Sequence, residues 1–176
     1  MIIKFVGLAL TLLMVIHSYP QVVKPRPAFG LNLVFSKPIG NFSNEVNFGA
    51  GAAVFGGIAW EKTSLFATTG YRVLSDGWCL CNNLLEYVPV KVGVKQFVSA
   101  KTMYVQGDLG IASVKSGGVV QSSFAADIGV GLQLSKFQLG LFYETFTRRI
   151  YYEQNSSNAN SFNAKIGFDF SVKHGK

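Results

Sequence analysis

The feature that most constrains this chain is a strict alternation of apolar and non-apolar residues on either side of position 135. Every second residue from 124 to 134 is apolar: Phe124, Ala126, Ile128, Val130, Leu132 and Leu134. After Ser135 and Lys136 the alternation resumes. Period two over about ten residues is typical of a β-strand, and two such runs across a two-residue turn predict a hairpin. Strands of about 10 residues with an unbroken apolar stripe also match the height of a bilayer.

The same alternation recurs along the chain and predicts eight strands, at residues 29–35, 48–60, 64–74, 87–97, 102–113, 122–134, 137–150 and 162–172. The second of these runs is interrupted at Phe55 and Gly56. Long connections (36–45, 75–86, 115–121 and 151–160) alternate with short ones (61–63, 98–101 and 135–136). Short turns at one rim and long loops at the other are typical of outer-membrane barrels, so the expected fold is an all-β, eight-stranded antiparallel up-and-down transmembrane β-barrel.

Charged residues in the middle of the predicted strands all fall on the face that carries the glycines. They are five cations and four anions: Arg72, Lys91, Lys95, Arg148 and Lys165, with Asp108, Asp127, Glu144 and Asp169. The opposite face carries many large aromatic and aliphatic groups, which would overpack the narrow interior of an eight-stranded barrel. We therefore expect the apolar face to meet lipid and the nine charged residues to form a network in the lumen.

The first residues have the pattern of an export signal. One positive charge at Lys4 precedes an apolar run at residues 5–16, about as long as a signal h-region and too short to span a bilayer as a helix. No Ala-x-Ala cleavage pattern follows, so an uncleaved anchor helix is the alternative. The expected organisation is a signal peptide at 1–20, a proline-containing lead-in at 21–28, the barrel at 29–172 and a tail at 173–176.

Composition agrees with this prediction and argues against nucleic-acid binding. The 176 residues suffice for one domain, and they combine 19 Gly and 15 Phe with only 14% charged residues. The net charge of +7 is spread along the chain without a basic run. Nucleic-acid-binding proteins cluster their basic residues, so we expect no nucleic-acid partner.

Several segments resemble a known family. The glycine-aromatic rhythm of FGAGAAVFGGIAW, together with TTGYRV, VPVKVGVK and DIGVGLQL, is similar to the small outer-membrane barrels of the OmpA/OmpX type and to the porin-like barrel-domain family of Gram-negative Bacteroidetes. The resemblance covers about residues 29–172. It implies an outer-membrane location, contact with outer-membrane lipid, and surface or periplasmic protein partners reached through the loops. One departure is the segment SVKHGK after Phe170, where the family often ends on an aromatic residue.

Enzymatic chemistry is not expected. Two enzymes known on similar barrels act on lipid A and imply a His working with a Ser, but the two histidines here, His17 and His174, lie outside the predicted strands. An acid/base pair among the strand carboxylates is the alternative to structural ion pairing, which buried charges need in any case. For Cys79 and Cys81 the alternatives are a redox pair, half of a metal site, a loop disulfide or unpaired cysteines. We expect a loop disulfide or unpaired cysteines, since two thiolates alone make a poor zinc site. We expect no cofactor.

Three functions remain. The favoured one is a non-enzymatic integral outer-membrane barrel with a charged, plugged lumen and long surface loops, in a structural, adhesion or accessory role in a surface or secretion complex. The first alternative is a small-solute channel, which nine lumen charges argue against. The second is a secreted, soluble, lipocalin-like carrier, which requires the apolar face to point inward.

Overall fold

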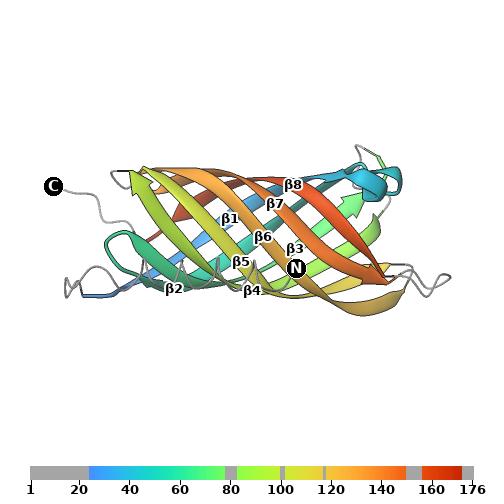
Figure 1. Cartoon of the computed structure of the whole chain (residues 1–176), viewed down its shortest axis with the longest axis horizontal. Coiled ribbons are helices and arrows are strands. Elements are labelled where there is room, and N and C mark those ends of the chain that lie inside the picture. The colour runs from blue at the N-terminus through green and yellow to red at the C-terminus, as the bar shows by residue number, and fades with distance from the viewer. Residues whose placement is uncertain (1–23, 78–82, 100–101, 117, 150–155, 172–176) are drawn as a thin grey trace, which may run out of the picture.

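The chain forms one closed β-barrel. The computed structural model describes residues 24–77, 83–99, 102–116, 118–149 and 156–171, so the predicted signal peptide and tail lie outside the described residues. Eight strands follow one another around the barrel (Figure 1): β1 Arg26–Ile39, β2 Phe48–Ala59, β3 Thr63–Ser75, β4 Asn83–Ser99, β5 Met103–Ser116, β6 Val119–Leu134, β7 Phe137–Arg149 and β8 Ser156–Asp169. The predicted eight-stranded antiparallel up-and-down barrel is confirmed.

Each strand pairs with its sequence neighbours, and β8 pairs with β1 to close the sheet. Following the paired residues once around the barrel from Arg26 leads back to β1 at Ser36, ten residues further along the strand. This stagger tilts the strands by about 40° in an eight-stranded barrel. Closure leaves no open sheet edge, which a hydrocarbon environment would not tolerate.

The two faces of the sheet differ as the alternation predicts. Apolar side chains point outward and are exposed, among them Val90, Leu139 and Ile166 at 53%, 43% and 45%. The charged residues Lys91 and Glu144 are buried in the interior, at 3% and 0%. The barrel wall is therefore apolar outside and polar inside.

The predicted interruption of the second strand is wrong. Phe55 is buried in the lumen and Gly56 faces outward, so β2 keeps its alternation without a break. An aromatic residue on the inner face and a glycine on the outer face only look irregular when each face is expected to carry one kind of residue. Within the described strands, other rings also lie inside: Phe66, Tyr87, Tyr104, Phe142 and Phe146.

Several strands extend beyond their predicted ends. Residues 36–39 continue β1, residues 83–86 begin β4, and residues 156–160 begin β8, where loops were expected. The predicted long loop at 115–121 is wrong, because β5 ends at Ser116 and β6 begins at Val119. By contrast, the two-residue turn between β6 and β7 is confirmed, with Leu134 paired to Phe137.

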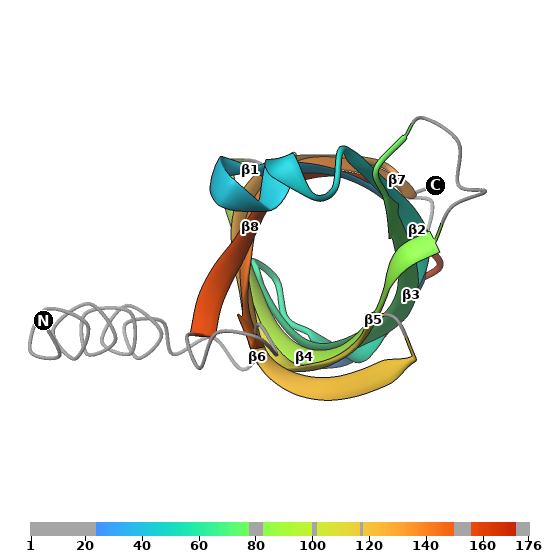
Figure 2. The same cartoon turned by 90° about the vertical axis from the view of Figure 1, so that its right-hand side faces the viewer.

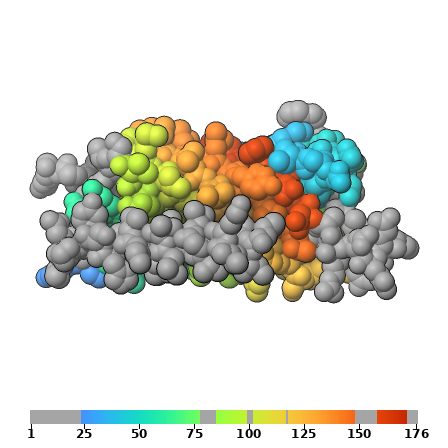
Figure 3. Space-filling view, in the orientation of Figure 1, coloured from blue at the N-terminus to red at the C-terminus, as the bar shows by residue number. Residues whose placement is uncertain are grey.

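The rim formed by the β1–β2, β3–β4, β5–β6 and β7–β8 connections is called here the loop rim, and the opposite one the turn rim. A short 3-10 helix, η1 Gly40–Asn44, lies at the loop rim and contacts β1 and β8 (Figure 2). In the space-filling view this segment, in light blue, stands at the end of the molecule (Figure 3). Among the described residues no helix has the length and apolar character needed to cross a membrane.

Candidate functional site in the barrel interior

Three carboxylates stand side by side on neighbouring strands. Asp108 on β5 is paired in register with Asp127 on β6, and Asp127 is paired with Glu144 on β7. All three side chains are on the inner face and are almost fully buried. Like charges directly opposite each other in a sheet repel, so this row needs cations close by. Lys91 on β4 and Lys165 on β8 come from the two strands that flank the row, and Arg72 on β3 comes from across the barrel.

Glu144 is the meeting point of the network. Its Oε2 atom lies 2.6 Å from Nη2 of Arg72, and its Oε1 atom lies 2.8 Å from Nζ of Lys91. Two neutral groups also donate hydrogen bonds to this carboxylate: the Tyr87 hydroxyl to Oε1 at 2.8 Å, and the Asn163 amide to Oε2 at 2.7 Å. Arg72 is on β3 and Glu144 on β7, four strands apart in a ring of eight, so this ion pair crosses the lumen.

Two lysines connect the rest of the row. Lys91 Nζ lies 2.5 Å from Oδ2 of Asp127, in addition to its contact with Glu144. From β8, Lys165 places Nζ 3.2 Å from the same Asp127 oxygen and 3.7 Å from Oδ2 of Asp108. The Lys165 ammonium also lies 3.8 Å from the centre of the Phe142 ring, a cation–π arrangement. Six of the predicted lumen charges therefore form one continuous cluster: Arg72, Lys91, Asp108, Asp127, Glu144 and Lys165.

The other predicted residues lie elsewhere. Lys95 is buried on the turn-rim side of the cluster and donates to Oε1 of Gln138 at 2.7 Å. Asp169 is at the end of β8, where its Oδ1 accepts the backbone N–H of Ser171 at 2.9 Å and also the Ser171 hydroxyl. Arg148 pairs with Ser157 in the backbone register, and its side chain lies outside the described part of the structure. Cys79 and Cys81 lie outside the described residues as well.

An apolar layer fills the lumen between the charged cluster and the loop rim. Phe42 of η1 points inward and packs edge-on against Phe146, with ring centres 5.5 Å apart. Phe146 in turn lies 4.8 Å from the ring of Tyr87, whose hydroxyl belongs to the charged cluster. The layer comprises Phe42, Val46, Leu74, Leu85, Tyr87, Ala112, Val114, Ala125, Phe146 and Ala159. These side chains pack against one another inside the barrel near the loop rim.

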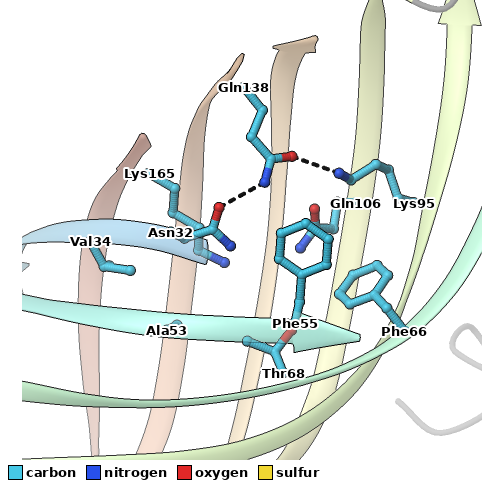
Figure 4. Close-up of a pocket in the computed structure, with 10 residues that line it drawn as sticks. All are labelled: Asn32, Val34, Ala53, Phe55, Phe66, Thr68, Lys95, Gln106, Gln138 and Lys165. Carbon is cyan, nitrogen blue, oxygen red and sulfur yellow. Dashed lines mark hydrogen bonds between the residues drawn. The ribbon is translucent and has the colours of Figure 1, made fainter. Parts of the chain in front are cut away.

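A small cavity lies on the turn-rim side of the cluster (Figure 4). Its walls include Lys95, Gln138 and Asn32, which form a chain in which Lys95 donates to Gln138 and the Gln138 amide donates to Asn32, each at 2.7 Å. Phe55 and Phe66 cover one side of it. Its volume is about 20 Å³, which is room for about one water molecule.

This arrangement favours a structural role over a catalytic one. A general acid or base must reach a substrate atom directly or through one water. Here the carboxylates of Asp127 and Glu144 are enclosed by cations, and the neighbouring cavity has a volume of about 20 Å³. Among the described residues, no group of three or more His, Cys, Asp or Glu side chains is placed to hold a metal ion.

The sequence reasoning missed the neutral members of the network. Tyr87, Asn163 and Ser36 complete the hydrogen bonding of Glu144 and Arg72, with Ser36 Oγ 3.0 Å from Nη1 of Arg72. For Tyr87 and Asn163 the signal in the sequence is parity, because each lies on the inner face of a predicted strand, as do the charged residues. Ser36 lies in the segment 36–45, which was expected to be a loop, so parity did not assign it to a face. The inward position of Phe42 had no such signal, because it lies in a segment expected to be a loop.

Comparison with known proteins supports the fold only. No family model matches the chain, and no curated protein matches it. The crystal structure of Neisserial surface protein A aligns with 84% of this chain and 98% of its own, at 10% identity and a TM-score of 0.52. The Yersinia pestis outer-membrane protein Ail, as determined in a phospholipid bilayer nanodisc, aligns with 82% of this chain and 100% of its own, at 13% identity and a TM-score of 0.49. The likeness to the Neisserial protein, together with the eight-stranded closed sheet, shows that the chain has the fold of small eight-stranded barrels.

Proposed function

We propose that this protein is a non-enzymatic integral outer-membrane β-barrel with a closed lumen, and that its role is structural, adhesive or accessory to a surface or secretion complex. The observation that carries the proposal is the distribution of side chains, which is the reverse of that in a soluble protein: polar groups lie inside and apolar groups outside. Ion pairs such as Arg72–Glu144 fill the centre, while Leu141 at 67% exposure and Ile111 at 64% lie on the outside. Such a wall is stable in lipid and would aggregate in water.

Three successive barriers support the proposal of a closed lumen. The apolar layer at the loop rim comes first, the charged cluster spans the centre, and the Lys95–Gln138–Asn32 chain lies below it. Hydrated ions need a continuous polar path, and packed apolar side chains do not offer one. We therefore favour the plugged barrel over the small-solute channel.

The soluble carrier is the least supported of the three functions. A carrier of apolar ligands needs an apolar interior cavity of several hundred Å³. The cavity on the turn-rim side of the charged cluster measures about 20 Å³ and has Lys95 and Lys165 in its wall. Neither its size nor its charge suits such a ligand.

The location and the family belong to the same proposal. The predicted signal peptide would deliver the chain to the outer membrane, with the loop rim facing outward. The strand rhythm supports membership of the porin-like barrel-domain family of the Bacteroidetes. The name of Neisserial surface protein A describes a surface protein on the same fold.

Two measurements test the proposal together. A folded barrel resists detergent at room temperature and migrates differently on a gel before and after boiling, so we expect a mobility shift. In planar bilayers the same preparation should give no steady conductance. Identical mobility with and without boiling would contradict the membrane barrel, and stable single-channel steps would contradict the closed lumen.

A further inference from the structure

The turn rim carries a row of four aromatic rings on its outer surface. Phe137, at the start of β7, packs edge-on against Phe168 of β8 at 5.2 Å between ring centres. Phe168 lies 4.9 Å from Phe170, and Phe170 is stacked on Phe29 of β1 at 5.6 Å. Three of these rings remain largely exposed, at 60% for Phe137 and 52% for both Phe29 and Phe170. We call these four residues the aromatic row.

Basic side chains surround the aromatic row. Lys136 in the β6–β7 turn places its ammonium 6.0 Å from the centre of the Phe168 ring. On the other side, Lys24 and Arg26 precede Phe29 and are exposed, and Lys62 is exposed in the β2–β3 turn. Since β2 is next to β1, these basic residues and the aromatic row occupy one continuous sector of the turn rim. We call the whole sector the basic-aromatic patch.

The charge of this rim is unbalanced. Among the turn-rim side chains described, the anions are Glu61 and Asp169, and Asp169 is buried and bonded to Ser171. The loop rim differs, because its described lysines, Lys37 and Lys115, are accompanied by the anions Glu45, Asp76 and Glu86. There Lys115 is paired with Glu86 at 3.0 Å. Among the side chains that the structure describes, the excess of positive charge is therefore at the turn rim.

We propose that the basic-aromatic patch binds the headgroups of anionic phospholipids and holds the turn rim in the leaflet that carries them. Aromatic rings prefer the interface between hydrocarbon and headgroups, so the aromatic row places this sector at headgroup depth. At that depth lysine and arginine side chains attract anionic lipid over a distance of about a Debye length. The inference rests on the proposed membrane location and adds the lipid class and the sector that recognises it.

Trp60 provides a reporter within this sector. It follows Ala59, which is paired with Arg26, and its indole is 37% exposed. The chain has two tryptophans, so a Trp78→Phe background leaves Trp60 as the single fluorophore. The experiment reconstitutes this protein in phosphatidylcholine vesicles containing phosphatidylglycerol, and places short-range bromine quenchers on the acyl chains of one lipid at a time.

We expect brominated phosphatidylglycerol to quench Trp60 more than brominated phosphatidylcholine at equal mole fraction, with about a fivefold preference at low salt. The double variant Arg26→Gln/Lys136→Gln should bring the preference close to one. The control Lys115→Gln, at the opposite rim, should leave it unchanged. Raising the salt to about 1 M, where the Debye length is about 3 Å, should abolish the preference in the parent protein without any substitution.

Equal quenching by the two lipids in the folded parent protein would overturn the inference, as would a preference that survives either the double variant or high salt. Gel mobility before and after boiling, measured on the same samples, separates this failure from a failure of the proposed function. A barrel that folds without lipid preference contradicts only the patch. A chain that does not fold in vesicles contradicts the membrane barrel itself.

Discussion

Glu144 accepts hydrogen bonds from Arg72, Tyr87, Lys91 and Asn163 while fully buried. Removing its charge leaves two cations in the interior without their shared carboxylate. Breaking a buried ion pair on one side costs about 3–5 kcal/mol, so we expect Glu144→Gln to lower the free energy of unfolding by that amount. Denaturant titration of the barrel in detergent, followed by tryptophan fluorescence or gel mobility, measures the change.

The matched control for this prediction is Glu86→Gln. Glu86 also accepts from a lysine, Lys115, at 3.0 Å, but the pair is exposed to solvent at the loop rim. Exposed pairs contribute about 0–1 kcal/mol. Similar losses in the two variants would show that the interior network stabilises the barrel no more than a surface pair does.

Gly131 leaves room for the hydroxyl end of the Tyr104 side chain against the barrel wall. A Cβ atom added at Gly131 would be 2.3 Å from Cζ of Tyr104 and 2.6 Å from the carbonyl oxygen of Leu139. The Tyr104 ring would have to shift, and the Leu139 carbonyl belongs to the backbone of β7 and cannot move away without disturbing the sheet, so Gly131→Ala should destabilise the barrel by about 1–3 kcal/mol. The control is Gly56→Ala, where a Cβ atom meets nothing within 4 Å. An equal effect of both substitutions in the same unfolding assay would contradict this explanation.

The inner and outer faces were predictable residue by residue, because period two assigns each side chain of a strand to one face. The ion-pair partners of the charged side chains could not be predicted in this way. Which cation meets which carboxylate depends on the ten-residue stagger, which brings Arg72 of β3 to the level of Glu144 of β7. That stagger is a property of the closed sheet, and no local pattern in the sequence encodes it.

At the scale of single elements, η1 is the part of the fold that the sequence did not reveal. Its Phe42 is 4% exposed and lies over Phe146 at the loop rim. Removing a buried phenylalanine ring costs about 3–5 kcal/mol, and the cost falls where neighbours can collapse into the space. We expect Phe42→Ala to destabilise the barrel toward the lower end of that range and to speed hydrogen exchange of backbone amides in residues 40–47.

The control for η1 is Ser43→Ala, which removes only an exposed hydroxyl that donates to the Gly40 carbonyl at 2.7 Å. Its effect should be within about 0.5 kcal/mol, as for most surface substitutions. If Phe42→Ala left both stability and exchange at the level of Ser43→Ala, η1 would not be a packed cap of the lumen.

Strand existence was easier to predict than strand length. Each strand carries an alternating apolar stripe, but the stripe ends where the lipid ends, whereas the hydrogen-bonded ladder continues. The extensions at 36–39 and 156–160 carry Ser, Lys, Pro and Asn, which resemble loop residues in composition. The 115–121 segment was misjudged for the related reason that Gly117 and Gly118 suggest a loop, although a turn of that size needs only two residues between β5 and β6.

Closure of the sheet by β1 and β8 is the property on which the whole molecule depends, and it can be tested directly. Leu33 on β1 is paired in register with Ile166 on β8, and both side chains are exposed on the outer face. Paired residues in a sheet have Cα atoms about 4.5–5.5 Å apart, within the range that a disulfide bridges. We expect Leu33→Cys/Ile166→Cys, in a background with Cys79→Ser and Cys81→Ser, to cross-link on oxidation of the folded barrel.

The control is Leu33→Cys/Leu139→Cys, since Leu139 is the partner of Ile166 on β7 and therefore lies two strands away from Leu33. Two strand spacings of about 4.8 Å put these Cα atoms beyond disulfide reach. Cross-linking of both pairs, or of neither, would contradict the closed barrel with this register, whereas cross-linking of the first pair alone requires that the first and last strands of the chain meet.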